Sequence, residues 1–336
     1  MKETLYRLHG IGLSFTTDSQ AIASATEALL RYFRQETPDR SMAIECLFKG
    51  VRDRTEIPVA ISRDAQPVFS RNGQAAGDLL RTEWKCDLYR DHERLLVDFH
   101  EQGLLVLEPH RDRIHGYLIE PDAMHPDVIS SFILFALTEV LKGLGVYTIH
   151  AAALEKGGRG VLIPGFSGKG KTTCCLALLR AGYRYLSDDH PFIRESGANV
   201  ELLSFPVKID VTDKTIEFFP ELRAAAESLH EGVRKRYFYV EDLYSQRPAD
   251  CCKPALMIFP HVIDWPKSYL EPVSKSYALE HLLPQALLVF DKEVCRREFE
   301  VLSRLVEQVS CYRLYFGEDL LDLPRLIDPF LKSGTV

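Results

Sequence analysis

The sequence of 336 residues has little cysteine and no long uninterrupted hydrophobic run. Its 8 cysteines form no C-x-x-C pair, so a disulfide framework and a structural zinc site are both disfavoured. The N-terminal residues contain no signal-peptide core, and the most apolar helical segment, from Phe132 to Leu144, is interrupted by Thr138, Glu139 and Lys142. We therefore expect a cytoplasmic protein with reduced thiols and no membrane partner.

The sequence also lacks an excess of positive charge. Its formal net charge of −7 argues against nucleic acid as the main partner, because a polyanion is bound largely through lysine and arginine. A hydrophobic fraction of 46% and a charged fraction of 26% are typical of a globular protein with a sizeable core.

The length is sufficient for two domains, and the best boundary is the proline-containing segment from Glu120 to Pro126. Residues 1–122 predict a smaller α+β domain, in which a helix from Gln20 to Arg34 precedes a series of short strands. This domain shows no catalytic pattern, so we expect it to recognise a substrate or partner. Residues 123–336 predict an α/β domain. It opens with an apolar helix that begins at Asp127, ends near Gly143 or Gly145, and is expected to pack under the sheet of that domain.

The segment from Gly165 to Thr172 fits the P-loop pattern G-x-x-x-x-G-K-[ST] at every position. A short apolar strand, Val161 to Pro164, leads into it, and a helix from Lys171 to Ala181 leads out. In this setting backbone amides point at phosphate oxygens, Lys171 reaches the outer phosphates and Thr172 supplies an oxygen to Mg²⁺. The predicted nucleotide-binding residues are Gly165, Phe166, Ser167, Gly168, Lys169, Gly170, Lys171, Thr172 and Thr173. The competing interpretation is a glycine- and lysine-rich turn without a ligand.

Two carboxylates follow the next predicted strand. Tyr183 to Ser187 reads as a strand, and Asp188 and Asp189 come directly after it. The carboxyl edge of an α/β sheet is where such folds place their ligands. Because neighbouring side chains in a strand point to opposite sides, one carboxylate could face the metal through Thr172 and the other an incoming hydroxyl. The alternative is a solvated turn.

Short segments around the P-loop carry a family resemblance. Thr148–His150, Gly160–Ile163, Leu178–Tyr183 and Leu186–Asp189, together with the P-loop, resemble the core of the HPr kinase/phosphorylase family. They are still more similar to the HPr-kinase-like serine kinases that act on other protein or peptide substrates, including those of lasso-peptide gene clusters. The resemblance is good over roughly residues 150–190 and weaker toward the C-terminus. It implies a P-loop, PEP-carboxykinase-like fold for residues 123–336 and, because relatives often assemble through this domain, a homo-oligomer.

The resemblance also implies roles for individual residues. Lys171 and Thr172 would bind phosphate and Mg²⁺, Asp188 would be the base toward a serine hydroxyl, Asp189 would help to hold the metal, and His150 would lie near the phosphates. A histidine in an apolar strand is, however, more often a satisfied core residue than a catalytic one.

The sequence departs from the family in two places. It has Thr172 and Thr173 where HPr kinases usually carry Ser-Glu, and it lacks their later Arg-Gly signature with an acidic metal ligand. Glu201 occupies about the right place and is a candidate ligand. These departures weaken HPr as the substrate and weaken the reverse phosphorolysis reaction.

A run of three cations, Arg234, Lys235 and Arg236, lies beside aromatic residues further along the chain. Lys235 and Arg236 could clamp a γ-phosphate or steer an acidic peptide, since such side chains stabilise a phosphoryl group in transfer. A solvated basic face is the competing interpretation.

The sequence therefore predicts a kinase that uses ATP and Mg²⁺, with GTP not excluded, to phosphorylate a serine or similar hydroxyl on a protein or peptide. A ribosomally made peptide precursor is one candidate acceptor. The alternatives are a small-molecule kinase on the same fold and a non-enzymatic nucleotide sensor.

Overall fold

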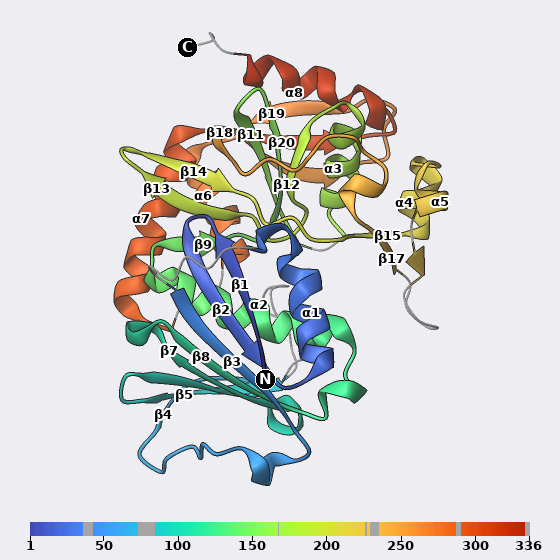
Figure 1. Cartoon of the computed structure of the whole chain (residues 1–336). Coiled ribbons are helices and arrows are strands. Elements are labelled where there is room, and N and C mark those ends of the chain that lie inside the picture. The colour runs from blue at the N-terminus through green and yellow to red at the C-terminus, as the bar shows by residue number, and fades with distance from the viewer. Residues whose placement is uncertain are drawn as a thin grey trace. The chain divides into compact units, whose positions relative to one another are not determined.

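The computed structural model describes residues 1–35, 43–72, 85–166, 168–225, 227–228, 235–286 and 290–332. The chain divides into two compact units, Met1–Val146 and Tyr147–Val336, each a mixture of helices and sheets (Figure 1). The division falls after Val146 rather than after residue 122. No helix in the described ranges is both long and apolar enough to span a bilayer.

The first unit contains an eight-stranded sheet with the strand order β1-β2-β3-β8-β7-β6-β5-β4. β2 and β8 each pair with β3 in parallel, and the remaining neighbours are antiparallel. The strands are β1 (Lys2–Leu8), β2 (Ile11–Thr17), β3 (Ala43–Val51), β4 (Gln66–Asn72), β5 (Lys85–Asp91), β6 (Arg94–Asp98), β7 (Gly103–Glu108) and β8 (Arg113–Ile119).

Two helices pack on this unit. In α1 (Gln20–Leu30), the Ser19 hydroxyl caps the first turn by accepting a hydrogen bond from the Ile22 amide at 3.3 Å. α2 (Pro126–Gly143) packs against α1, β7 and β8, and the rings of Phe99 and Phe132 lie 4.3 Å apart between their centroids. The expectation that this apolar helix belongs to the second domain is therefore wrong. Its hydrophobic side chains are buried against the sheet of the first unit.

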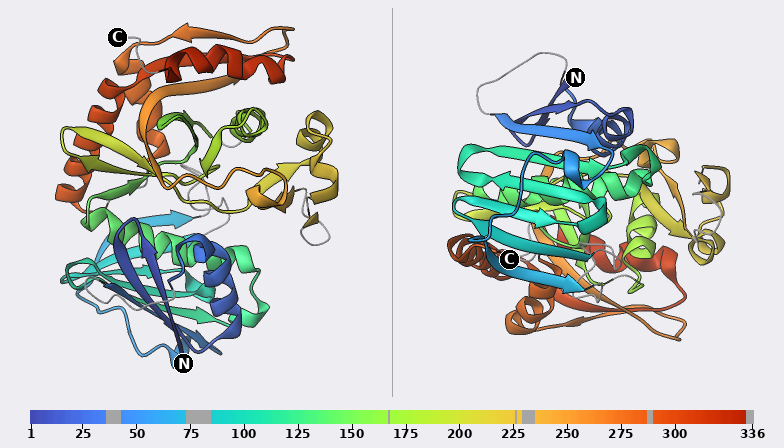
Figure 2. Two further views of the ribbon diagram at one scale, coloured as in Figure 1. Left: turned by 45° about the horizontal axis from the view of Figure 1, so that its top comes forward. Right: turned by 90° about the horizontal axis from the view of Figure 1, so that it is seen from below.

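The second unit is built on a nine-stranded mixed sheet (Figure 2). Its main path is β12-β10-β11-β18-β14-β13-β9, and β20 pairs with both β18 and β19. β11, β18 and β20 run parallel to one another, so their carboxyl ends meet at the same edge. The strands are β9 (Val146–Thr148), β10 (Ala151–Lys156), β11 (Arg159–Pro164), β12 (Arg184–Ser187), β13 (Phe192–Ser196), β14 (Asn199–Leu203), β18 (Cys251–Val262), β19 (Tyr269–Pro272) and β20 (Ser310–Phe316).

Hydrophobic side chains cover both faces of this sheet. On β11, Val161 and Ile163 belong to one apolar cluster and Leu162 to the other, as the two-residue period of a strand requires. α3 (Lys171–Arg180) and α8 (Leu323–Leu331) contribute to the first cluster, and α6 (Lys275–Leu282) and α7 (Lys292–Gln308) to the second. The sheet is thus a buried central layer that can hold the ends of its strands in fixed positions.

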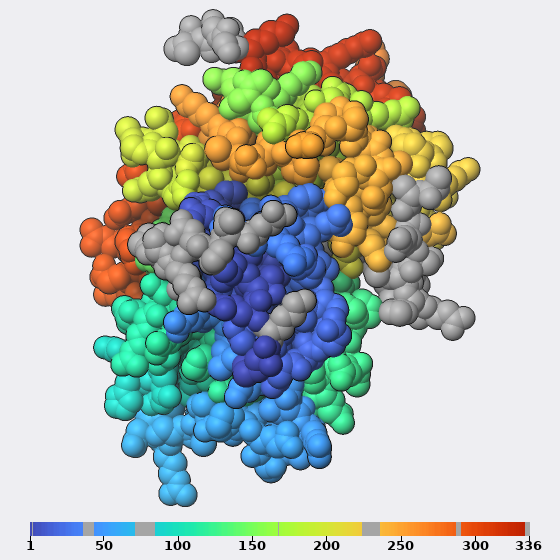
Figure 3. Space-filling model, in the orientation of Figure 1, coloured from blue at the N-terminus to red at the C-terminus, as the bar shows by residue number. Residues whose placement is uncertain are grey.

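A small sheet with the order β15-β17-β16 lies at the edge of the second unit, in yellow in the space-filling view (Figure 3). It consists of β15 (Ile209–Thr212), β16 (Glu227–Ser228) and β17 (Lys235–Phe238), and it is accompanied by α4 (Asp213–Phe218) and α5 (Leu222–Ala225).

Candidate functional site

The P-loop connects β11 to α3, as the sequence predicts. Gly168 and Gly170 have φ angles of 80° and 94°, in the left-handed region that other residues rarely adopt. Gly170 occupies the N-cap position of α3, and no described side chain caps that helix. The first backbone amides of α3 therefore donate to no described capping side chain, and they can bind an anion. Ser167 lies outside the described residues.

The other predicted P-loop side chains differ in exposure. The Phe166 side chain is 41% exposed and Lys169 is exposed, while Thr172 and Thr173 are half-buried in the first turn of α3. Lys171 is buried. In a P-loop the lysine has to reach the outer phosphates, whereas the position of Phe166 carries no such requirement.

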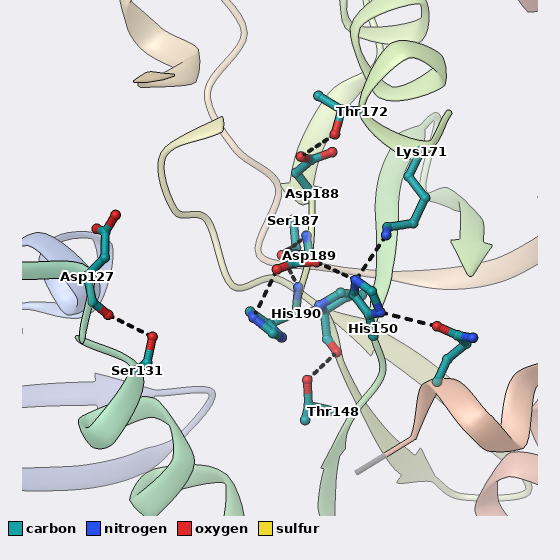
Figure 4. A network of polar contacts seen from close by, with 12 residues as sticks. Asp127, Ser131, Thr148, His150, Lys171, Thr172, Ser187, Asp188, Asp189 and His190 are labelled. Carbon is teal, nitrogen blue, oxygen red and sulfur yellow. Dashed lines mark hydrogen bonds and ion pairs between the residues drawn. The ribbon is translucent and has the colours of Figure 1, made fainter. Parts of the chain in front are cut away.

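Thr172 and Asp188 contact each other directly. The Thr172 hydroxyl donates a hydrogen bond to Asp188 Oδ2 at 3.0 Å (Figure 4). Asp188 follows β12, which the sheet order places two positions from β11, with β10 between them. The fold therefore brings the P-loop threonine to the first of the two predicted aspartates.

Asp188 is a buried acid. Its burial, and next the negative charge of Asp189, raise the pKa of its carboxyl from 3.8 to about 6. The charge of Asp210 on β15 acts in the same direction, while Lys171 and the Thr172 hydrogen bond act against it. The second carboxylate oxygen, Oδ1, is buried and has no N–H or O–H donor among the described residues. A buried carboxylate oxygen without such a donor is well suited to a cation.

Lys171, His150 and Asp189 meet at a single imidazole nitrogen. Lys171 Nζ lies 2.9 Å from His150 Nε2, and Asp189 Oδ1 lies 2.8 Å from the same atom. Lys171 also donates a hydrogen bond to the Gly165 carbonyl oxygen at 2.6 Å. A neutral Nε2 would accept a hydrogen bond from Lys171, whereas a protonated Nε2 would donate one to Asp189. The two contacts therefore favour opposite protonation states of one nitrogen.

Asp189 is held in a tight turn and is accessible. The Ser187 hydroxyl accepts hydrogen bonds from the amides of Asp189 and His190, at 3.4 and 3.0 Å. The Asp189 side chain is 45% exposed, and His190 Nε2 lies 3.2 Å from its Oδ2. The partial burial of Asp189 would by itself raise the pKa of its carboxyl, but His190 and His150 outweigh this effect and hold the pKa well below 3.8. The two adjacent carboxyls thus differ in accessibility and in acidity.

His150 is fixed from its other side by Gln285. The Gln285 carbonyl accepts a hydrogen bond from the His150 amide at 2.7 Å, and its side-chain oxygen lies 3.2 Å from His150 Nδ1. Sequence reasoning missed Gln285, and it also missed His190. His190 directly follows the aspartate pair and could have been included, but no local pattern links a glutamine to a histidine so far away in the chain.

Glu201 and Arg236 do not join this network. Glu201 Oε1 accepts hydrogen bonds from Arg194 Nη2 at 2.6 Å and Nε at 3.0 Å. Arg236 Nη2, on the small sheet, lies 3.5 Å from Asp213 Oδ1. The side chain of Lys235 lies outside the described part of the structure. Among the described residues, no group of three or more His, Cys, Asp or Glu side chains is arranged to hold a metal ion.

No protein-family model matches the chain, and no curated protein matches it significantly. Among solved structures, the HPr(Ser) kinase/phosphatase from Coxiella burnetii aligns with 55% of this chain and 93% of its own chain, with 16% sequence identity and a TM-score of 0.29. A TM-score this low carries no argument about function.

Proposed function

We propose that the second unit is a kinase that transfers the γ-phosphoryl group of ATP to a hydroxyl on a protein or peptide. The observation that supports this best is the meeting of the P-loop with the aspartate pair, where Thr172 contacts Asp188 and Lys171 shares His150 with Asp189. A phosphate cradle next to two carboxylates of different character is what phosphoryl transfer requires.

The phosphates would bind to the amides between Gly165 and Thr172 and to the Lys171 ammonium. Lys171 Nζ lies 2.6 Å from the Gly165 carbonyl oxygen and 2.9 Å from His150 Nε2, so its ammonium group is already held at the loop where the phosphates would bind. When Lys171 binds the phosphates, His150 Nε2 can donate its hydrogen bond to Asp189 without competition from the lysine. The conflict at this nitrogen is thereby removed.

Thr172 and Asp188 fit a Mg²⁺ ion. They supply oxygen ligands, which Mg²⁺ prefers, and the buried Asp188 Oδ1 provides a carboxylate oxygen with no N–H or O–H donor among the described residues. When bound, Mg²⁺ would neutralise charge on the phosphate oxygens. This assignment reverses the one based on the sequence, which gave the metal to Asp189 and the acceptor hydroxyl to Asp188.

Asp189 is better placed than Asp188 to receive an acceptor. Its side chain is 45% exposed, whereas Asp188 is 8% exposed and is bonded to Thr172. In the proposed reaction, Asp189 accepts the proton of the hydroxyl, the hydroxyl oxygen bonds to the γ-phosphorus, and the bond from that phosphorus to the bridging oxygen breaks. ADP leaves, and Lys171 stabilises the charge that develops on the phosphates. A protein or peptide acceptor is favoured by the sequence resemblance.

The test compares two variants. Asp188→Asn is expected to remove the Mg²⁺ dependence of ATP binding in calorimetry with and without EDTA. Asp189→Asn should keep Mg·ATP binding but lower phosphoryl transfer at least about 100-fold, as expected when a general base is lost. Transfer is measured by mass spectrometry as the addition of a phosphoryl group to the protein or peptide encoded beside this chain.

Glu195→Gln is the matched control, because Glu195 pairs with Arg304 on the surface at 2.7 Å. If the effects of the two aspartate variants are exchanged, the sequence-based roles are correct. If both aspartate variants keep Mg·ATP binding and phosphoryl transfer, the kinase proposal is contradicted. If a metabolite is phosphorylated in place of the protein or peptide, the chain is a small-molecule kinase.

A further inference from the structure

An exposed apolar patch lies next to the P-loop. It consists of Val262, the last residue of β18, and Trp265 in the loop that follows. The side chains of Val262 and Trp265 are 58% and 62% exposed. An indole this exposed presents a large, flat apolar face on which a planar ligand can stack.

The parallel strands determine where this patch lies. β11, β18 and β20 end at the same edge, and Val262 pairs with Phe316 at the ends of β18 and β20. A Cβ atom added to Gly170 would lie 3.4 Å from Val262 Cγ2, so Val262 is in contact range of the final glycine of the P-loop. Asp188 follows β12, on the opposite side of β11 from β18. The patch and the aspartate pair therefore flank the P-loop from opposite sides.

The loop that carries Trp265 is held firmly. The Trp265 carbonyl accepts a hydrogen bond from the Glu318 amide at 3.1 Å, and the Ile263 amide donates to the Phe316 carbonyl at 3.0 Å. A Cβ atom at Gly317 would lie 2.4 Å from the Trp265 carbonyl oxygen, so the two loops approach closely at that point.

A second set of hydrogen bonds secures the end of the same loop. The Ser268 hydroxyl donates to Asp319 Oδ1 at 2.6 Å and accepts from the Gly317 amide at 3.0 Å. The backbone around Trp265 is thus fixed while its side chain faces solvent. A ligand that stacked on the indole would not have to order the loop, and this favours binding.

We propose that the base of the bound nucleotide stacks on the Trp265 indole and that Val262 contacts the same nucleoside. This inference rests on the proposed nucleotide-binding function. The phosphates occupy the P-loop, the aspartate side receives the acceptor, and the nucleoside extends over the opposite side, where Val262 is in contact range of Gly170. Stacking on an aromatic ring accepts any base, so ATP and GTP both bind, and purines bind more tightly than pyrimidines because their π-faces are larger.

Calorimetry with two ligands tests the inference on the full-length protein. Mg·ATP carries a base and tripolyphosphate does not. Trp265→Ala is expected to raise the Kd for ATP by roughly five- to 100-fold, the usual effect of losing a base–aromatic stack. Its Kd for tripolyphosphate stays within about twofold of the wild-type value, and Trp265→Phe retains most of the ATP affinity. Phe299→Ala on α7, where the side chain is 47% exposed, is the matched control and leaves both constants unchanged.

Fluorescence provides an independent readout, because the chain has only 2 tryptophans. In a Trp84→Phe variant, Trp265 is the single tryptophan, and its emission changes on addition of ATP but not of tripolyphosphate.

The outcomes separate the two proposals. If wild-type protein binds neither ATP nor tripolyphosphate, the nucleotide function and the stacking inference both fall. If it binds both ligands and Trp265→Ala has no effect, or weakens both equally, only the stacking inference is overturned. It is also overturned if Trp265→Ala leaves nucleotide binding unchanged and raises only the KM for the acceptor, because the patch then serves the acceptor.

Discussion

Replacing Thr172 with valine tests the contact on which the metal assignment depends. Valine keeps the β-branched shape of threonine but cannot donate the 3.0 Å hydrogen bond to Asp188. The Asp188 carboxyl would then be buried without any N–H or O–H donor among the described residues, because its other oxygen already lacks one. The ionised form of Asp188 should become less favourable in the folded protein.

The size of the effect follows from the pKa. A rise of the Asp188 pKa from 3.8 to about 6 means that ionising this carboxyl costs about 2 to 3 kcal/mol more in the folded than in the unfolded protein. A hydrogen bond to a charged group contributes about 1.5 to 3 kcal/mol, so its loss should raise the pKa further, by about one to two pH units.

The sign of the pH dependence is fixed by this raised pKa. The folded protein binds more protons than the unfolded one between pH 3.8 and about 6, so Asp188 makes the free energy of unfolding fall as the pH rises through that range. In Thr172→Val this fall continues to higher pH. The stability difference attributable to ionisation should be close to zero at about pH 5 and reach about 1 to 2 kcal/mol at about pH 8.

Urea unfolding at a series of pH values, with EDTA present to exclude divalent cations, measures this difference. Thr173→Val is the matched control, because it makes the same substitution one residue along α3, where no contact with Asp188 is described. A stability difference that does not change with pH would refute the reasoning. So would a carbon-13 titration that places the Asp188 pKa of the variant at or below the wild-type value.

Two further predictions concern stability elsewhere. Asp328 accepts hydrogen bonds from Tyr183 Oη at 2.6 Å and from Lys156 Nζ at 2.7 Å. Burial opposes ionisation of the Asp328 carboxyl, but these two hydrogen bonds outweigh it and lower the pKa. Asp328→Asn should therefore cost about 1 kcal/mol at neutral pH, a difference that urea unfolding should show disappearing below the ordinary aspartate pKa. A Cβ atom at Gly116 would lie 2.3 Å from the Phe48 ring, so Gly116→Ala should destabilise the first unit by about 1 to 3 kcal/mol, and an unchanged thermal midpoint would contradict this packing.

Local patterns made several elements predictable. The strand before the P-loop and the helix after it appear as β11 and α3, because glycines, a buried apolar run and good helix formers are adjacent in the chain. Helix α7 (Lys292–Gln308) also begins at a local signal, because the Asp291 side chain caps its first turn. The apolar helix α2 was also predicted as a helix, but its partner was not, since hydrophobicity shows that a face will be buried and not against which sheet.

The candidate site also combines features that local sequence predicts with features that depend on the fold. The P-loop, Lys171 and the aspartate pair were all found from local sequence, because each is defined by residues next to one another. The contact between Thr172 and Asp188, and the support of His150 by Gln285, depend on which strands are neighbours. A linear pattern does not contain that information.

Nearby residues therefore determined the position of the glycine-rich loop between β11 and α3, the presence of two carboxylates after a strand and the types of most elements, since backbone conformation and hydrophobic period are local properties. Only the tertiary structure decided which aspartate is buried against Thr172 and which is exposed beside two histidines. It also brought Val262, three residues before Trp265, into contact range of Gly170, because the parallel strands β11, β18 and β20 end at one edge although long segments of chain separate them. Burial and strand order are properties of the assembled sheet, and they assign different roles to residues that look alike in the sequence.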